Sequence, residues 1–140
     1  MIPVLKFLLL QRGDWLVFGI GTDIIEIQRV EEKLRRTKGL KKRIFTPREI
    51  AYCESKAKSA QHFAARFAAK EAFLKAIGTG WRGGYRFVDI EILNNEQGKP
   101  ELLLQGKVKS FCEENGITGF HVSLSHIKEL AKAVVVLEKH

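Results

Sequence analysis

The pattern of apolar residues in the N-terminal third of the chain predicts a strand followed by a helix. Apolar and β-branched residues crowd residues 15–27, as in a buried strand, and Gly19 and Gly21 interrupt them. A glycine inside a strand marks a bend or a close approach of another backbone. From Gln28 the apolar residues follow a helical period, which Gly39 ends. We therefore expect a strand followed directly by a helix.

The middle of the chain contains the strongest helix signals. Thr46-Pro47-Arg48-Glu49 combines an N-cap residue, a proline at the first helical position and a glutamate that can complete a capping box. Residues 60–77 form the longest periodic segment; they are rich in alanine, and Gly78 follows them. This composition predicts a buried helix.

The C-terminal half alternates between strand and turn signals. The pattern predicts a helix at residues 107–115 and strands at 85–93, 101–104, 120–125 and 131–137, the last two as a hairpin. Helices grouped between strands, without regular βαβ alternation, indicate an α+β fold with a mainly antiparallel sheet packed on the long helix. A chain of 140 residues with 45% hydrophobic and 29% charged residues fits a single compact domain.

Charge and cysteine content narrow the functional classes. The net charge of +8 indicates a polyanionic partner, which could be nucleic acid, an acidic membrane, a phosphorylated ligand or an acidic protein. Cys53 and Cys112 have neither CxxC nor zinc-finger spacing, so we expect no disulfide framework and a cytoplasmic location. No apolar run is long enough to span a membrane.

One glycine motif is misleading. Residues 78–83 match the pattern G-x-G-x-x-G of dinucleotide-binding proteins. That site requires a strand before the motif and a helix after it, and the predicted order here is the reverse. We interpret the segment as a loop.

Glu71 is the most informative single residue, because it shares a helix face with alanine, phenylalanine and leucine side chains. A carboxylate among apolar groups is costly to desolvate unless a cation is its partner. One interpretation is an ion pair with Lys75 one turn later; the other is a metal-binding or catalytic role. Spacing alone leaves both open.

Asp23 directly follows the glycines of the first strand and could be a turn residue. Together with Glu71 it could instead supply two hard oxygen ligands, and Mg²⁺ is commonly held by one or two carboxylates plus substrate phosphates. Lys70 and Lys75 could then bring positive charge to such a phosphate. This hypothesis requires the first strand and the long helix to meet.

Two polar groupings remain. His121, Ser123 and Ser125 share one face of a predicted strand, where a lone histidine is most often structural. The predicted helix after the first strand and the residues that follow it carry many positive charges. They include Arg29 and Arg36 on the helix and Arg43 after it. A solvated face or a docking surface for an acidic partner would both explain them. Aromatic residues for base stacking are missing there, which weighs against nucleic acid.

Taken together, three segments resemble the small, stand-alone 4′-phosphopantetheinyl transferases, the bacterial holo-acyl-carrier-protein synthases. They are Gly19–Ile24, Phe63–Ala76 and His121–His126. The likeness extends from about Val17 to Leu137. It implies an enzyme that moves phosphopantetheine from coenzyme A to a serine of apo-acyl carrier protein with Mg²⁺, releases adenosine 3′,5′-bisphosphate, and supports fatty acid biosynthesis.

The resemblance also implies roles for individual residues. Asp23 and Glu71 match the metal ligands, and Lys75 matches the lysine near the pyrophosphate; we assign catalysis to Glu71 and Lys75. The residues matched to the bound coenzyme are Lys70, Lys99, Pro100 and His121, and those matched to the carrier-protein surface are Arg29, Arg36 and Arg43.

The family is typically a cytoplasmic homotrimer with active sites at subunit boundaries, and its members begin near the first strand. We therefore expect residues 1–16 to be an extra N-terminal segment and residues 17–140 to form the transferase domain. The rival hypothesis is a non-catalytic basic module that binds nucleic acid, whose binding would weaken steeply with salt and ignore coenzyme A.

Overall fold

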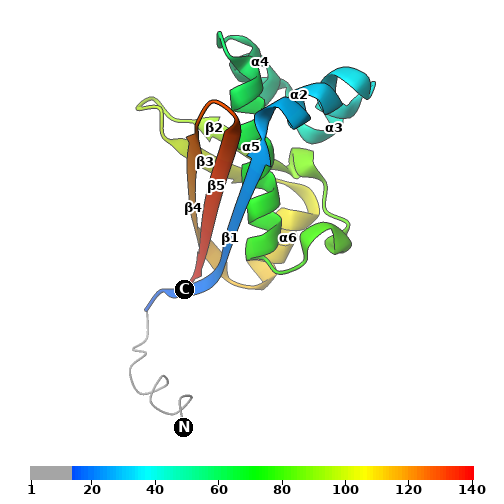
Figure 1. The fold of residues 1–140 in the computed structure, drawn as a ribbon. Coiled ribbons are helices and arrows are strands. Elements are labelled where there is room, and N and C mark those ends of the chain that lie inside the picture. The colour runs from blue at the N-terminus through cyan, green and yellow to red at the C-terminus, as the bar shows by residue number, and fades with distance from the viewer. Residues whose placement is uncertain (1–13) are drawn as a thin grey trace.

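The computed structural model describes residues 14–140, and its centre is one long helix, α5 (Ser59–Ala76), packed on a three-stranded antiparallel sheet (Figure 1). The sheet has the order β1 (Leu16–Glu26), β5 (Leu130–Lys139), β4 (Ile117–His126). This arrangement confirms the predicted α+β class, the long buried helix and the C-terminal hairpin.

The remaining elements surround this pair of layers. Figure 1 shows short helices gathered at one end of the sheet, a small two-stranded sheet beside β4, and a further helix near the opposite end of α5. The helices are α2 (Ile27–Arg36), α3 (Leu40–Ile44), α4 (Pro47–Glu54) and α6 (Gly106–Glu114), the strands β2 (Ile90–Asn94) and β3 (Pro100–Leu104), and the 3₁₀ turns η1 (Gly80–Gly83) and η2 (Phe87–Asp89).

Side-chain alternation along β5 explains how the sheet covers α5. Ala131, Ala133, Val135 and Leu137 are fully buried against the helix layer, while the residues between them face the opposite side. Four alanines of α5, Ala68, Ala69, Ala72 and Ala76, are buried in the core with most of these residues, and their small size lets helix and sheet backbones come close. Burial of this apolar surface supplies the main stabilisation of the fold.

The two glycines of β1 bring its backbone unusually close to α5. A Cβ atom on Gly21 would lie 1.7 Å from the carbonyl oxygen of Ala72, and one on Gly19 would lie 1.9 Å from that of Ala76. No side chain fits in such a space. Of the two interpretations of these glycines, the structure therefore supports close backbone approach, and this approach decides where the next residues of β1 lie.

The predicted strand at residues 85–93 is only partly correct. Its first half forms the turn η2, and β2 begins at Ile90. The reason lies in the tertiary contacts of Phe87, whose carbonyl accepts a hydrogen bond from Lys70 and whose ring packs on Phe67. The helix α3 has no counterpart among the sequence predictions.

Other local predictions are confirmed. Thr46 accepts a hydrogen bond from the backbone N–H of Glu49, whose side chain accepts one from the backbone of Thr46, so the capping box is complete. The predicted extra segment, residues 1–16, lies outside the described residues except for its last three and stays a prediction. Within residues 14–140, no helix is both long and apolar enough to cross a membrane.

A candidate active site between the first strand and the long helix

The site begins with two carboxyl groups that are 48 positions apart in the sequence. Asp23 lies two residues after Gly21 on the face of β1 that meets α5, and Glu71 lies next to Ala72, the helix residue that Gly21 approaches. The two side chains come within hydrogen-bonding reach of each other. The tight contact between strand and helix therefore brings the predicted pair together.

The environment of this pair disfavours two negative charges. The pKa of Glu71 is raised to about 7, first by burial and then by the adjacent carboxyl of Asp23, while Lys75 and Lys33 act in the opposite direction. The Oδ2 atom of Asp23 is buried, and no donor among residues 14–140 reaches it. Buried carboxylate oxygens are nearly always satisfied, so this oxygen is available to a further ligand.

Lys75 completes the site from one turn further along α5. Its ammonium donates to Oδ1 of Asp23 at 3.0 Å and to the backbone carbonyl of Thr22 at 3.0 Å. The ion pair therefore joins helix to strand, whereas the ion-pair interpretation placed Lys75 on Glu71. More than half of the lysine side chain remains exposed, so its charge can also reach a ligand in front of the site.

These donors fit a magnesium ion. The two carboxylates offer hard oxygen atoms, one of which has no partner, and Mg²⁺ needs only one or two carboxylates when substrate phosphates and water complete its shell. Within the described part of the chain, no group of three or more acidic, histidine or cysteine side chains is arranged so that it could hold a metal ion by itself. The site thus suits a cation shared with a phosphorylated ligand better than one held by protein alone.

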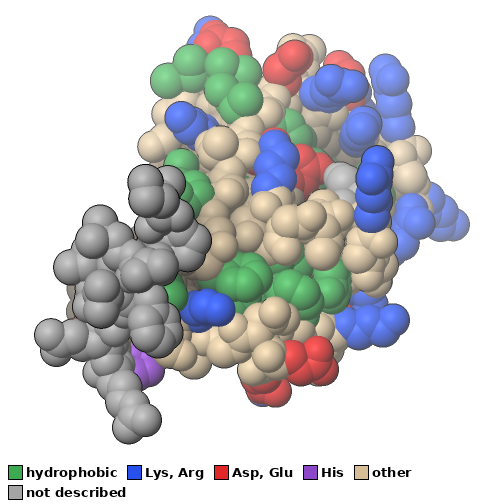
Figure 2. Space-filling model, turned by 90° about the horizontal axis from the view of Figure 1, so that it is seen from below, with side chains coloured by type: hydrophobic (Ala, Val, Ile, Leu, Met, Phe, Trp, Pro, Cys, Tyr) green, Lys and Arg blue, Asp and Glu red, His purple; other side chains and the backbone are tan. Residues whose placement is uncertain are grey.

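A cleft of about 440 Å³ opens beside Glu71. Its wall is mainly apolar, and its basic members are Arg29 and Lys33 on α2 and Arg43 on α3. Figure 2 shows that Lys and Arg side chains also gather along one edge of the molecule. Arg36 lies on the last turn of α2 and does not line the cleft.

A second groove, of about 610 Å³, holds the residues matched to the coenzyme. Lys99, Pro100 and His121 all line it. His121 projects from the face of β4 opposite to buried Val122, and its Nε2 lies 2.8 Å from Oε1 of Glu138. The two cavities share no lining residue. Within one chain, the acidic pair and this groove therefore belong to different surfaces.

Lys70 lines neither the cleft beside Glu71 nor the groove of the coenzyme-matched residues. Its side chain is fully buried, and its ammonium donates to Glu49 and to two backbone carbonyls. A lysine has three N–H donors, and all three are used inside the protein. This geometry gives no support to the predicted contact of Lys70 with bound coenzyme.

Lys33 belongs to the basic helix that the sequence suggested as a docking surface, and it lines the cleft one helical turn after Arg29. Glu138 was not predicted as a site residue. No sequence signal could have found it, because it reaches His121 across neighbouring strands whose register only the folded sheet defines.

Comparison with known proteins agrees with this geometry. A sequence model of the 4′-phosphopantetheinyl transferase superfamily matches residues 19–135. The holo-[acyl-carrier-protein] synthase of Geotalea daltonii is 50% identical over 125 residues, which cover 89% of this chain and all of that protein.

Solved structures are similar as well. The holo-[acyl-carrier-protein] synthase of Neisseria meningitidis matches with a TM-score of 0.80 and 38% identity, covering 89% of this chain and 100% of that one. The Helicobacter pylori synthase, solved in complex with coenzyme A, has a TM-score of 0.74 and 34% identity, covering 84% of this chain and 98% of that one.

Proposed function

This chain belongs to the 4′-phosphopantetheinyl transferase superfamily, and from that premise we propose that it transfers phosphopantetheine from coenzyme A to a serine of apo-acyl carrier protein with the help of Mg²⁺. The observation that carries the proposal is the close approach of the Asp23 and Glu71 carboxyl groups. Oδ2 of Asp23 is buried there, and no described residue donates a hydrogen bond to it. The second product is adenosine 3′,5′-bisphosphate.

Asp23 and Glu71 would hold the magnesium ion. When bound, Mg²⁺ neutralises charge on the pyrophosphate of the coenzyme and polarises the phosphorus that is attacked. Phosphoryl transfer requires little covalent chemistry from the protein, so positioning and charge neutralisation are the main tasks of the site.

Side chains of the protein itself would stabilise the negative charge on the leaving phosphate and take up the proton of the serine hydroxyl. The serine Oγ of the carrier protein forms a bond to phosphorus while the bond from phosphorus to the bridging pyrophosphate oxygen breaks. Lys75, with its exposed ammonium beside Asp23, stabilises negative charge on the leaving phosphate. Glu71, a carboxylate that lines the same cleft, would accept the serine proton either directly or through a water molecule.

The coenzyme would extend over a second copy of the chain. Lys99, Pro100 and His121 would border its nucleotide, but the groove they line is separate from the acidic pair of the same chain. We therefore propose a homotrimer in which the groove of one subunit faces the acids of the next. In support, Ile20 and Ile24 on β1 are more than 60% exposed on the outer face of the sheet, as expected for a surface that a neighbour covers.

The carrier protein would dock at the basic cleft. Arg29 and Arg43 lie at the cleft that contains Glu71, and Arg36 extends the positive charge along α2. An acidic partner is drawn to such a surface, and the apolar wall can receive one of its side chains. With this partner, we assign the enzyme to cytoplasmic fatty acid biosynthesis.

Mass spectrometry of the carrier protein tests the function. Apo-acyl carrier protein incubated with the wild-type chain, coenzyme A and Mg²⁺ should gain the mass of one phosphopantetheine group, and chelation of Mg²⁺ with EDTA should stop the gain. An unchanged carrier mass with Mg²⁺ present would contradict the proposal, and so would full activity in EDTA.

The Arg29→Ala variant tests the docking surface in the same assay. Its KM for the carrier protein should rise more than its Kd for coenzyme A, because Arg29 lies at the cleft and not at the coenzyme groove. Equal losses for both substrates would remove Arg29 from the docking surface.

A further inference from the structure

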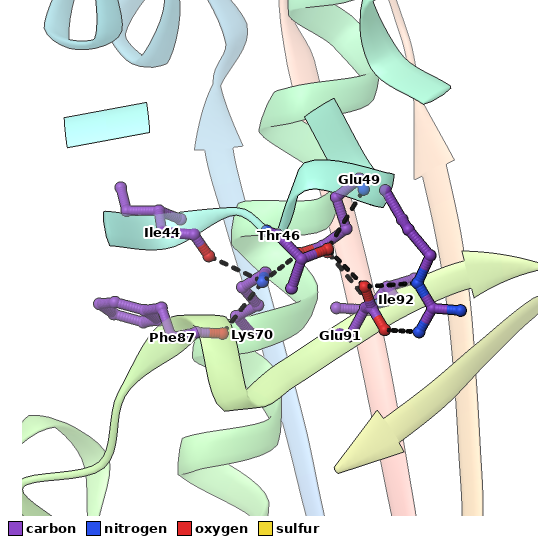
Figure 3. Close-up of polar contacts among 8 residues, drawn as sticks. Ile44, Thr46, Glu49, Lys70, Phe87, Glu91 and Ile92 are labelled. Atoms are coloured by element: carbon purple, nitrogen blue, oxygen red, sulfur yellow. Dashed lines mark hydrogen bonds and ion pairs between the residues drawn. The ribbon is translucent and has the colours of Figure 1, made fainter. Parts of the chain in front are cut away.

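The buried lysine of α5 has an unusual set of partners. The Nζ atom of Lys70 donates to Oε1 of Glu49 at 2.7 Å, to the carbonyl oxygen of Ile44 at 2.8 Å and to that of Phe87 at 3.0 Å (Figure 3). Both members of the ion pair are completely buried. One ammonium thus binds two backbone segments that are 43 positions apart in the sequence.

Both segments belong to the wall of the cleft beside Glu71. Ile44 is the last residue of α3, and Phe87 is the first residue of η2; each lines the cleft together with Phe45. The ammonium of Lys70 also lies 5.4 Å from the ring centre of Phe45. Lys70 is therefore a direct link between two parts of the cleft wall.

The partner of Lys70 is anchored just as firmly. Oε1 of Glu49 also accepts the backbone N–H of Thr46, and its Oε2 accepts the backbone N–H of Ile92 at 3.1 Å. Figure 3 shows these bonds converging from α4, α5 and β2. Because Glu49 and the carbonyl groups of Ile44 and Phe87 all bind the same ammonium, the ammonium cannot shift without moving the cleft wall.

Stability alone is a weak explanation for such a pair. Apolar side chains of similar volume often replace a buried ion pair without loss of folding free energy. What they cannot replace is direction, since an apolar side chain has no donor with which to hold two carbonyl oxygens at fixed positions. Lys70 also directly precedes Glu71, the residue of α5 whose carboxyl group lines the cleft.

We propose that Lys70 is a positioning residue: its ammonium holds the two wall segments of the cleft at the spacing that admits the acyl carrier protein beside Glu71. This inference rests on the proposed function and deepens it. Lys70 does not touch substrate; it acts through the backbone at Ile44 and Phe87.

The test is a double variant, Lys70→Met with Glu49→Gln, which removes both buried charges with little change of shape. The KM for apo-acyl carrier protein should rise about 10- to 100-fold, because small displacements of a positioned partner are costly. The Kd for coenzyme A should change less than about 2-fold, since no residue of its groove contacts Lys70.

Val108→Ala is the matched control. Val108 is fully buried in α6 and does not line the cleft, so this variant lowers the unfolding temperature without changing the wall. At equal loss of stability, it should keep the wild-type KM for the carrier protein. A wild-type KM in the double variant, or the same KM increase in both variants, would overturn the positioning role.

A second measurement keeps the test decisive if the double variant does not fold. In the wild-type chain, the carbonyl ¹³C shifts of Ile44 and Phe87 should change when apo-acyl carrier protein is added and stay constant with coenzyme A alone. Constant shifts in both titrations would overturn the proposal. Failure of the wild-type chain to modify any carrier would instead overturn the proposed function.

Discussion

Two lysine–carboxylate pairs on the same helix have opposite environments. Lys70 and Glu49 are both 0% exposed, whereas Lys75 is 54% and Asp23 is 11% exposed. The shortest distances are similar, 2.7 and 3.0 Å, and the lysines are five residues apart on α5. The chemical groups are the same, so environment alone separates their roles.

The two pairs differ in whether the second carboxylate oxygen, the one not bound to the lysine, has a hydrogen-bond donor. Both oxygens of Glu49 accept hydrogen bonds within the protein, while Oδ2 of Asp23 has no donor among the described residues. A saturated pair can only hold its surroundings in place. A pair with an unsatisfied oxygen and a partly exposed lysine can still bind a cation or a phosphate, which is why we propose Asp23 and Lys75 as the reactive pair.

The largest expected effect is on stability, from breaking the buried pair. Glu49→Ala should lower the unfolding free energy by about 3–5 kcal/mol, because it leaves the ammonium of Lys70 buried without its counter-ion. Glu54→Ala breaks the exposed pair with Lys41 and should cost less than about 1 kcal/mol. Urea unfolding of both variants measures the contrast, and equal losses would contradict it.

The second-largest effect is on the rate of transfer, and it should come from a change in the pair of Asp23 and Lys75. Asp23→Asn should slow phosphopantetheine transfer about 100-fold or more, because one of two charged ligands for Mg²⁺ is lost. The unfolding free energy should fall less than in Glu49→Ala, because Lys75 is largely exposed and the variant also removes the repulsion between Asp23 and Glu71. Transfer rates from mass spectrometry and calorimetric Mg²⁺ titration measure both, with Glu54→Gln as the control carboxylate.

A smaller effect should follow from separating strand and helix. In Gly21→Ala, the new methyl group would collide with the carbonyl of Ala72, so β1 must move away at a cost of about 1–3 kcal/mol. Gly19→Ala makes a similar collision with Ala76, further from Asp23. Both variants should lose stability, but Gly21→Ala should lose more transfer activity; equal activity in the two would contradict the role of this contact in joining the acids.

The smallest effect is a pH dependence of stability in EDTA. The pKa of Glu71 is raised in the folded chain to about 7 from an ordinary 4.5, so the folded state binds this proton more tightly than the unfolded state. The unfolding free energy should therefore fall as pH rises from about 4.5 to 7. Glu71→Gln should flatten this part of the profile in thermal unfolding, and an unchanged profile would contradict the shift.

Much of the local structure could be predicted because its causes are local. The capping box at Thr46 and Glu49, the alanine-rich helix and the alternation of β5 depend on residues close together in the sequence. The turn η2 could not be predicted, because the carbonyl of Phe87 is held by Lys70 from another element.

The candidate site divides in the same way. Asp23, Glu71 and Lys75 could be proposed from residue types and from the resemblance, and the structure brings them together. Lys70 looked equally suitable, because a sequence records that a lysine lies on a helix but not what surrounds its ammonium. The coenzyme-matched residues Lys99 and His121 line a groove separate from the acidic pair of the same chain, a separation that residue types alone do not reveal.

The sequence by itself predicted most of the helices and strands, and together with the family resemblance it suggested which side chains react, because these signals lie in local spacing and residue type. Only the tertiary structure decided which lysine is buried and which is available, and which oxygen has no donor. The physical reason is that burial and hydrogen-bond saturation depend on all neighbours in space. Most of those neighbours come from distant parts of the chain.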